Sequence, residues 1–223
     1  MLVYGKNVLK EIINNKTKVS KAFIYKNFED KDLINKLNCK INYLEKKELD
    51  KMVDGLHQGV ILQIDDYKYF DIDELGDKII MLDHIEDPHN LGAIIRTCEA
   101  AGIDSIIIPK DRSVLVNGTV MKTSVGTLSK IKISCVTNLV NSINYLKKKG
   151  YWIIGTDMDG DDYKSIDYSG KIVIIIGNEG KGISKLVRDN CDFVASIPMK
   201  GEVNSLNASV AAGIIIFETI RKG

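Results

Sequence analysis

Three polar stretches of the chain hold residues whose types could support chemistry. They are "DPHNLGAIIRTCEAAG" (87–102), "IIIGNEGKGIS" (174–184) and "IPMKGEVNSLNASVAAGI" (197–214). Their functional groups are two carboxamides, a guanidinium, a carboxylate and a hydroxyl, from Asn90, Asn207, Arg96, Glu179 and Ser205. Arginine and asparagine can hold phosphate and sugar oxygens, and the remaining groups are small and polar. This set is suited to a substrate whose reacting atom is a hydroxyl oxygen.

The glycine-rich stretch at 174–184 does not have the spacing of a phosphate-binding loop. A P-loop places four residues between its first glycine and the Gly-Lys pair. Here only two residues separate Gly177 from Gly180-Lys181. The glycines also fail the dinucleotide pattern G-x-G-x-x-G, and the carboxylate of Glu179 would repel a phosphate. The loop therefore predicts a ligand that carries no polyphosphate.

Metal and cysteine chemistry find little support in the sequence. His84, Asp87 and His89 lie close together, but their spacing matches no standard ligand set, so we expect no metal. The four cysteines lie far apart without a C-x-x-C motif, at positions Cys39, Cys98, Cys135 and Cys191. Such spacing argues against a zinc knuckle or a disulfide framework and is typical of a reducing cytosol. Cys98 is expected on the apolar face of a helix, which leaves no candidate for a covalent cysteine adduct.

Each candidate residue also has a purely structural interpretation. Asn90 could be the N-cap of a helix that begins near Leu91. Arg96 could be a solvated helix arginine, and Glu179 a surface charge on a strand-to-helix turn. The polar groups before the last helix could be caps as well. A functional interpretation is favoured because each of the three polar stretches follows a predicted strand.

The elements that position these stretches predict a mostly parallel α/β sheet. Near-continuous apolar segments indicate buried strands at 79–83, 105–109, 132–136, 151–156, 172–178 and 193–198. Helical stretches alternate with them, as at 92–102 and 139–150. This alternation is typical of a parallel sheet covered by helices on both faces. Ligands of such sheets bind beyond the carboxyl ends of the strands, where the three polar stretches begin.

Two domains and a linker are expected. Residues 1–64 alternate short elements, with helices near 5–14, 30–38 and 46–53 and strands at 21–25, 41–44 and 59–64. Residues 65–76 are acidic and aromatic without regular periodicity, which predicts a linker. Residues 77–223 hold the larger sheet and all three polar stretches. The first segment therefore predicts a small α/β domain, and the last segment a catalytic one.

Composition limits the class of protein. The chain has 223 residues, of which 44% are hydrophobic, and a formal net charge of +1. It can bury a core, and its total charge alone says nothing about nucleic acid. Residues 1–64 have a modest basic bias, with twelve lysines against eight acidic residues. The first residues lack the apolar segment of a signal peptide and no apolar run reaches membrane-spanning length, so we expect a cytoplasmic protein without a membrane anchor.

The three stretches, in this order, resemble the motifs of the SpoU, or TrmH-like, group of the SPOUT superfamily of RNA methyltransferases. Two segments of the first domain, "VYGKNVLKEII" (3–13) and "LHQGVIL" (56–62), are similar to an RNA substrate-binding domain. That domain occurs in the bacterial enzymes that methylate a guanosine ribose in 23S rRNA. The resemblance covers the chain apart from the linker. It implies a SPOUT α/β domain with a deep trefoil knot, and a homodimer formed through the helices around the site.

The resemblance also implies a cofactor and a site. The cofactor would be S-adenosylmethionine, which has no phosphate. Its pocket would be lined by Thr156, Gly177, Glu179, Ile197, Met199 and Leu206. The catalytic residues would be Asn90, Arg96, Glu179, Ser205 and Asn207. Because a guanidinium stays protonated at ordinary pH, we expect Arg96 to grip a phosphate and stabilise the developing alkoxide rather than to act as the base.

The predicted activity is methylation of a ribose 2′-hydroxyl of RNA, on a guanosine of 23S rRNA. A tRNA ribose methyltransferase and a ribosome-protecting resistance enzyme are alternatives within the same class. A non-catalytic RNA-binding protein is the alternative from a different class. An inert descendant should have lost an active-site residue, whereas all five catalytic positions of the resemblance are retained. The sequence therefore favours an enzyme.

Overall fold

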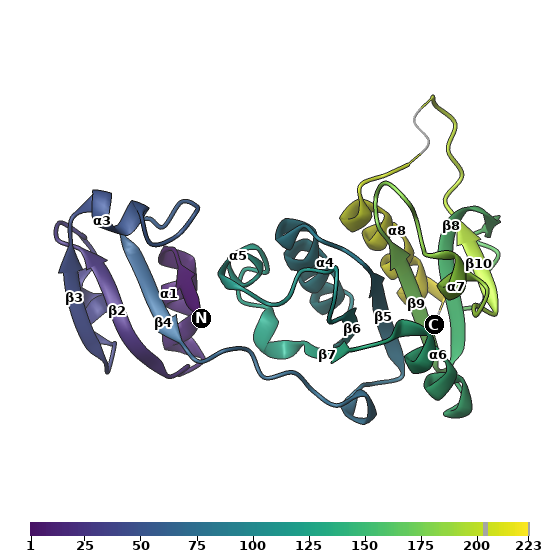
Figure 1. The fold of residues 1–223 in the computed structure, drawn as a ribbon, viewed down its shortest axis with the longest axis horizontal. Helices are drawn as coiled ribbons and strands as arrows, with labels where there is room; N and C mark the ends of the chain where they lie inside the picture. The colour runs from purple at the N-terminus through teal and green to yellow at the C-terminus, as the bar shows by residue number, and fades with distance from the viewer. Residues whose placement is uncertain (203–204, 223) are drawn as a thin grey trace. The chain divides into compact units, whose positions relative to one another are not determined.

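The computed structural model describes residues 1–202 and 205–222, and the chain divides into two compact units (Figure 1). The N-terminal unit comprises Met1–Lys68 together with Val116–Ser129. The C-terminal unit comprises Tyr69–Leu115 and Lys130–Gly223. The expected domain boundaries at residues 64 and 77 stay a prediction. The segment Val116–Ser129, which we expected in the catalytic domain, has its contacts with the N-terminal unit.

A four-stranded sheet forms the centre of the N-terminal unit, in the order β1-β4-β2-β3. Its elements are β1 (Leu2–Tyr4), α1 (Lys6–Asn14), β2 (Val19–Tyr25), α2 (Lys31–Asn35), β3 (Lys40–Leu44), α3 (Lys46–Asp50), β4 (Val60–Ile64) and α5 (Gly118–Thr123). The pair β2/β3 is parallel, and β4 pairs antiparallel with both β1 and β2. The sequence predicted most of these elements but missed β1 and α5, because three and six residues are too few to show a period.

Helix α5 packs directly on the backbone of β1. A Cβ atom on Gly118 would lie 2.3 Å from the carbonyl oxygen of Leu2, so only glycine allows this approach. The hydroxyls of Tyr4 and Thr119 are 3.1 Å apart, within hydrogen-bond distance. The side chain of Asn117 caps the helix by accepting from the backbone N–H of Thr119 and Val120. These local contacts hold the segment in the N-terminal unit.

Glu11 of α1 is a buried acid in this unit. Only 9% of the residue is exposed, and its carboxyl lies against Gly126. Among the described residues, Oε1 of Glu11 is the one buried side-chain oxygen or nitrogen without a hydrogen-bond partner. Burial raises the pKa of this carboxyl from 4.5 to about 7, because removing water disfavours the charged form.

The C-terminal unit is a six-stranded sheet in the order β10-β8-β9-β5-β6-β7, with every pair parallel. Its strands are β5 (Lys78–Asp83), β6 (Ser105–Pro109), β7 (Lys132–Val136), β8 (Trp152–Asp162), β9 (Ile172–Gly177) and β10 (Phe193–Ser196). Its helices are η1 (Ile72–Glu74), α4 (Pro88–Ala100), η2 (Leu128–Lys130, shared with the N-terminal unit), α6 (Leu139–Lys148), α7 (Lys185–Arg188) and α8 (Ala208–Lys222). The predicted α/β class with a mostly parallel sheet is confirmed.

The register of β5 and β9 brings two candidate loops together. Asp83 lies opposite Gly177, so the loops after both strands start side by side at the carboxyl edge of the sheet. The chain runs from β5 outward through β6 and β7 and then returns to the other side through β8 and β9. Such a change of direction is where parallel sheets place their ligands.

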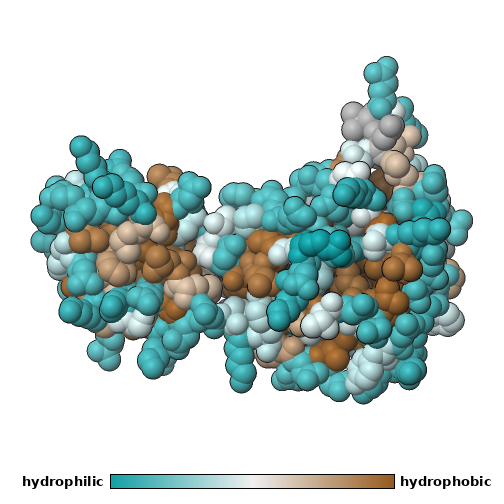
Figure 2. All heavy atoms as spheres, in the orientation of Figure 1, coloured by the Kyte–Doolittle hydropathy of each residue, from teal (hydrophilic) through white to brown (hydrophobic). Residues whose placement is uncertain are grey.

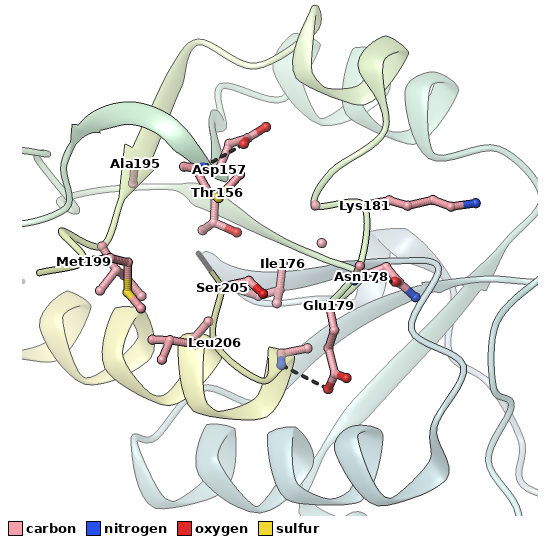
Figure 3. Close-up of a pocket in the computed structure, with 17 residues that line it drawn as sticks. Thr156, Asp157, Ile176, Asn178, Glu179, Lys181, Ala195, Met199, Ser205 and Leu206 are labelled. Carbon is pink, nitrogen blue, oxygen red and sulfur yellow. Dashed lines mark hydrogen bonds between the residues drawn. The ribbon is translucent and has the colours of Figure 1, made fainter. Parts of the chain in front are cut away.

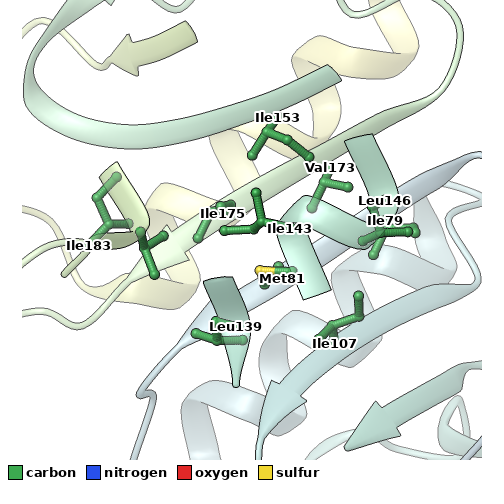
Figure 4. Close-up of a cluster of buried hydrophobic side chains, with 11 residues drawn as sticks. Ile79, Met81, Ile107, Leu139, Ile143, Leu146, Ile153, Val173, Ile175 and Ile183 are labelled. Carbon is green, nitrogen blue, oxygen red and sulfur yellow. The ribbon is translucent and has the colours of Figure 1, made fainter. Parts of the chain in front are cut away.

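A buried cluster holds α6 and α7 against this sheet (Figure 4). Ile143 of α6 and Val187 of α7 pack with alternate residues of the central strands, such as Met81 and Ile175. The intervening residues of these strands point to the opposite face, as strand geometry requires. Helices α4 and α8 contact each other, and α8 contacts β9. Because both faces of these strands are buried, their sequences are apolar at nearly every position.

The start of α4 differs from the expectation. The helix begins at Pro88 rather than near Leu91, and its N-cap is Asp87, whose carboxylate accepts from the N–H of His89 at 2.8 Å. Proline is favoured at the first helical position because it lacks an N–H that would otherwise stay unpaired. Asn90 is therefore inside the helix, and its carboxamide is available for other partners. The expected trefoil knot stays a prediction.

Hydrophilic side chains cover most of the face shown in Figure 2, with hydrophobic patches between them. Within residues 1–202 and 205–222, no helix has the length and apolar character needed to cross a membrane.

We expect Glu11→Gln to stabilise the chain in a pH-dependent way. Below pH 4.5 the carboxyl is protonated in both the folded and unfolded states, and burial then carries no charge penalty. Between about pH 4.5 and 7 the unfolded chain ionises first, so the wild-type free energy of unfolding should fall as pH rises. A neutral glutamine avoids this loss. The melting temperature of the variant should match wild type near pH 4.5 and exceed it at pH 8 by on the order of 3 °C.

Glu29→Gln is the matched control, because Glu29 is exposed in the same unit. Its melting temperature should follow wild type at every pH. A Glu11→Gln variant that is less stable than wild type at pH 8 would contradict the interpretation.

Candidate active site

A cavity of about 330 Å³ lies at the carboxyl edge of the sheet in the C-terminal unit (Figure 3). It is bounded by β8, the loop after β9, the segment after β10 and the start of α8. Its lining residues among those described are Thr156, Asp157, Met158, Ile176, Gly177, Asn178, Glu179, Gly180, Lys181, Gly182, Ala195, Ile197, Met199, Ser205, Leu206, Ala208 and Ala211.

The loop after β9 turns back on itself in a way that requires glycine. A Cβ atom on Gly177 would lie 2.2 Å from the carbonyl carbon of Gly182. Gly182 has φ +65°, in the left-handed region that favours glycine. Two backbone hydrogen bonds between Asn178 and Gly182, of 3.0 and 2.8 Å, close the turn. The backbone of residues 177–182 therefore forms one wall of the cavity.

This loop is tied to the end of β5 by two side chains. The carboxamide of Asn178 donates to the carbonyl of His84 at 3.0 Å. The buried carboxylate of Asp83 accepts from the N–H of Ser184 at 2.6 Å and pairs with the ring of His84. Because both contacts join adjacent strand ends, the loop is fixed before any ligand binds.

The residues expected to bind the cofactor all line this cavity, although their binding role stays a prediction. Thr156 donates its hydroxyl to the carbonyl of Ile175 at 2.8 Å, which holds β8 against β9. Figure 3 shows Met199 and Leu206 on the same side of the cavity, where they form an apolar wall. The side chain of Lys181 points away from that wall. The cavity thus offers backbone groups and apolar surface.

Glu179 connects the three polar stretches. Its Oε1 accepts from the carboxamides of Asn90, at 2.6 Å, and Asn207. The backbone N–H of Ala208, at the start of α8, donates to the same oxygen at 3.2 Å, and Figure 3 shows Glu179 directed at this helix end. Asn207 also donates to Oδ1 of Asn90 at 3.0 Å. A carboxylate is favoured here because it accepts several N–H groups and faces the positive end of a helix.

Arg96 does not join this cluster within one chain. It is exposed on α4, and among the described residues it makes no hydrogen bond or ion pair and does not line the cavity. Ser205 is exposed and lines the cavity. Of the five predicted catalytic residues, the structure therefore joins Asn90, Glu179 and Asn207 by hydrogen bonds. Ser205 lines the cavity with Glu179, whereas Arg96 neither lines it nor bonds to the cluster within the described residues.

Sequence reasoning missed several residues that shape the site. Asp83 and Asn178 were not selected, although both fix the glycine loop through backbone groups. Arg188 binds Asp157 of the cavity wall at 2.7 Å and was missed as well. Asp83 ends a predicted strand, and this position was the one available signal. The other contacts depend on loop geometry.

Metal and thiol chemistry have no assembled site in the described part of the chain. His84, Asp87 and His89 do not come together as ligands, and residues 1–202 and 205–222 contain no group of three such side chains able to hold a metal. Cys98 is fully buried in α4, and burial raises the pKa of its thiol to about 12. A protonated, inaccessible thiol is not a nucleophile.

The arrangement presents polar groups beside an apolar cavity. The Asn90–Glu179–Asn207 cluster presents amide and carboxylate groups beside an apolar cavity, and the hydroxyl of Ser205 lies at its edge. None of these groups is a strong nucleophile. The site is therefore suited to orienting a bound ligand and an acceptor oxygen rather than to covalent catalysis.

Comparison with known proteins agrees with this geometry. Residues 77–217 match the SpoU rRNA Methylase family, and residues 2–70 match the domain described as RNA 2′-O ribose methyltransferase substrate binding. YacO of Bacillus subtilis, assigned to the TrmH family of tRNA/rRNA methyltransferases, is 39% identical over 236 residues, covering 99% of this chain and 95% of the relative. A protein with the same assignment in Staphylococcus saprophyticus is 41% identical over 238 residues, covering 100% of this chain and 96% of the relative.

Solved structures share the fold. The SpoU methyltransferase AviRb of Streptomyces viridochromogenes, in complex with AdoMet, superimposes with a TM-score of 0.87 at 23% identity, over 99% of this chain and 89% of AviRb. An AdoMet-bound rRNA methyltransferase of Sinorhizobium meliloti gives 0.78 at 25% identity, over 99% of this chain and 86% of that one. With a family match over most of its length and relatives near 40% identity, the chain belongs to the SpoU rRNA methylase family of RNA methyltransferases.

Proposed function

We propose that this protein transfers a methyl group from S-adenosylmethionine to a ribose 2′-hydroxyl of rRNA, on a guanosine of 23S rRNA. The observation that carries the proposal is the Asn90–Glu179–Asn207 cluster at the edge of the glycine-loop cavity. It brings together all three stretches of the sequence that resemble methyltransferase motifs. The family assignment and the AdoMet complexes of AviRb and the Sinorhizobium meliloti enzyme support the cofactor.

The cavity fits S-adenosylmethionine in its chemistry. Gly177 and Gly182 line the cavity with bare backbone, and a Cβ atom on Gly177 would clash with the backbone of Gly182, so the turn that forms this wall requires glycine there. Met199 and Leu206 give apolar surface suited to adenine, and Lys181, the one lysine among the described lining residues, points away from that wall. When bound there, S-adenosylmethionine supplies an electrophilic methyl group. The chain itself contributes shape, orientation and exclusion of water.

We assign Arg96 to a second copy's site. Its guanidinium is exposed on α4 and, among the described residues, makes no hydrogen bond to the cluster of its own chain. The neighbouring helix α8 exposes Val210, Phe217 and Ile220, which are 50%, 49% and 42% accessible. Apolar groups spaced in this way on one helix favour burial against a partner. In the proposed homodimer, α4 and α8 meet the partner, and Arg96 reaches the acceptor phosphate and ribose oxygen held at the partner's site.

The N-terminal unit would bind the RNA substrate, as the match of residues 2–70 supports. Its lysines outnumber its acids over residues 1–64. A tRNA remains the second candidate substrate, because the relatives are assigned as tRNA/rRNA methyltransferases. Whether tRNA is found among the methylated products distinguishes a tRNA substrate from an rRNA substrate.

S-adenosylmethionine should stabilise the protein without RNA. A ligand that binds only the folded chain raises stability by about 2.7 kcal/mol at 100 times its Kd. Differential scanning fluorimetry should show a rise in melting temperature with S-adenosylmethionine or its demethylated product, and none with ATP. A response to ATP alone would contradict the proposed cavity chemistry.

The product should be a 2′-O-methylated ribose. Alkaline cleavage of RNA uses the 2′-oxygen as the internal nucleophile, so the modified linkage should resist alkali while its neighbours are cut. We would incubate unmodified 23S rRNA and a tRNA mixture with the enzyme and S-adenosylmethionine, then map resistant linkages and analyse nucleosides by mass spectrometry. Release of a base-methylated nucleoside from an alkali-labile linkage would show that the reaction type is wrong.

Mixed dimers should test the assignment of Arg96. We expect Arg96→Ala to lower kcat on the order of 100-fold, as loss of one transition-state contact does. Glu179→Gln should also inactivate its site, because it weakens the acceptor shared by Asn90 and Asn207. If Arg96 acts across the interface, a heterodimer of the two variants has one site with both groups intact. Random mixing of the two chains by co-expression should then restore about a quarter of wild-type activity.

Light scattering should report a dimer for wild type and both variants. If the mixture stays as inactive as its two parents while heterodimers are present, Arg96 acts within its own chain. A monomeric wild-type enzyme would remove the proposed interface.

A further inference from the structure

A second and larger cavity, of about 740 Å³, lies in the C-terminal unit and shares the glycine loop with the cofactor cavity. Residues of the loops after β5, β6, β7 and β9 line it, together with the starts of α6 and α7. Asn178, Lys181 and Gly182 line both cavities, so the loop is a wall common to the two. The volume falls within the roughly 300–1,000 Å³ of pockets that hold small ligands.

Three cations without partners line this larger cavity. Arg112 comes from the loop after β6, Lys181 from the glycine loop and Lys185 from the first position of α7. All three are exposed, and within residues 1–202 and 205–222 their side chains make no hydrogen bond or ion pair. Figure 3 shows the side chain of Lys181 directed away from the apolar wall of the cofactor cavity. Unpaired cations that meet in one cavity from separate loops favour an anionic ligand.

Backbone strain is concentrated at the same cavity. Five described non-glycine residues have a positive φ, and two of them, His84 at +59° and Arg112 at +52°, line it. The carboxamide of Asn178 donates to the carbonyl of His84 at 3.0 Å, and the N–H of Val114 donates to the carbonyl of Ile85 at 2.8 Å. Such a conformation costs free energy, persists where the surrounding structure holds it, and is frequent at ligand-binding sites.

The lining is not purely cationic, because three carboxylates belong to it. Asp83 is buried, accepts from the N–H of Ser184 and pairs with the ring of His84, so its charge is already used. Glu86 and Asp111 are exposed and, within the described residues, form no ion pair with the three cations. A carboxylate only accepts hydrogen bonds and repels an anion that has no donor. The ligand must therefore carry hydroxyl or amino donors beside its negative charge.

A nucleotide of single-stranded RNA has this combination of groups. Its phosphates suit the cations, and its 2′-hydroxyl and base amino groups suit the carboxylates. The cavity also offers apolar surface, from Val140 and from Leu186, which is 70% exposed. A splayed base can pack on such surface, as bases do on protein side chains when RNA is bound as a single strand.

The cavity adjoins the proposed acceptor site along the chain. Glu86 directly precedes Asp87, the N-cap of the helix that carries Asn90. Lys181 lies two residues after Glu179 on the glycine loop. An RNA strand with its target ribose at the Asn90–Glu179–Asn207 cluster can therefore continue into this cavity. A free nucleotide shares the chemistry, but only a strand gives a reason for the cavity to adjoin the cluster.

We propose that this cavity receives the nucleotide next to the methylated one in the RNA substrate. Arg112, Lys181 and Lys185 contact the backbone phosphates on either side of that nucleotide. Glu86 and Asp111 accept from its ribose hydroxyl and base amino groups. The proposal rests on the proposed function, because it takes RNA as the substrate. Phosphate contacts of this kind fix the register of the strand and carry no sequence information.

The test compares the full-length wild type with Arg112→Gln, Lys185→Gln and the control Lys148→Gln, which removes an exposed charge of α6 outside the cavity lining. Fluorescence anisotropy would follow binding of an oligouridine decamer between about 50 and 200 mM salt, since each phosphate contact on a single strand adds about −0.7 to the slope of log K against log salt. Arg112→Gln and Lys185→Gln should each bind roughly tenfold more weakly at low salt and lose about 0.7 from this slope. The control Lys148→Gln should match wild type.

Methylation of 23S rRNA gives a second readout. Arg112→Gln and Lys185→Gln should raise KM for RNA and leave kcat unchanged, because they remove binding that is equal in the ground and transition states. Both variants should bind S-adenosylmethionine like wild type. An oligodeoxyuridine decamer should bind wild type more weakly than oligouridine, since it lacks the 2′-hydroxyls.

Unchanged affinity and salt slope in Arg112→Gln and Lys185→Gln would overturn the proposal. Equal affinities for the ribose and deoxyribose decamers would overturn the roles of Glu86 and Asp111. If adenosine monophosphate binds wild type as tightly as the decamer and binds Arg112→Gln more weakly, the cavity is a free-nucleotide site instead. When wild type methylates RNA and both variants keep its KM, only the cavity assignment is wrong. Absence of RNA methylation by wild type would instead show that the proposed function is wrong.

Discussion

The site depends on one carboxylate, that of Glu179. It accepts from Asn90 on α4, from Asn207 before α8 and from the backbone of Ala208. Together with Glu179, these groups come from three distant parts of the chain, and the shared acceptor joins them beside the direct hydrogen bond from Asn207 to Asn90. The glycine turn at 177–182 positions this carboxylate. A side chain at Gly177 would clash with the backbone of Gly182, open the turn and move Glu179 away from both helices. The cavity for the cofactor and the cluster for the acceptor are therefore formed by the same loop.

Much of the C-terminal fold could be predicted because its strands are buried on both faces. Segments such as Ile172–Gly177 are apolar at nearly every position, and this is a strong signal in any parallel sheet. Short elements gave no such signal, which is why β1 and α5 were missed. The contact of α5 with β1 depends on a bare backbone at Gly118, and a lone glycine in the sequence does not say which partner approaches it.

The candidate site was predicted in its composition but less well in its arrangement. Asn90 was weighed as a cap, yet Asp87 is the cap, and Pro88 after it was the signal for that boundary. A capping carboxamide would bind the backbone of its own helix, whereas the carboxamide of Asn90, the third residue of α4, is free to hydrogen-bond Glu179. Arg96 could not be placed from spacing within one chain, since its position relative to the cluster depends on tertiary structure.

The two glutamates Glu179 and Glu11 show how environment decides what a carboxyl can do. Glu179 is exposed and has three donors, so its charge is satisfied and it can serve as a fixed structural centre. Glu11 is buried and has an oxygen without a donor, so its charge costs stability at neutral pH. A glutamine would remove this cost with almost no change of shape.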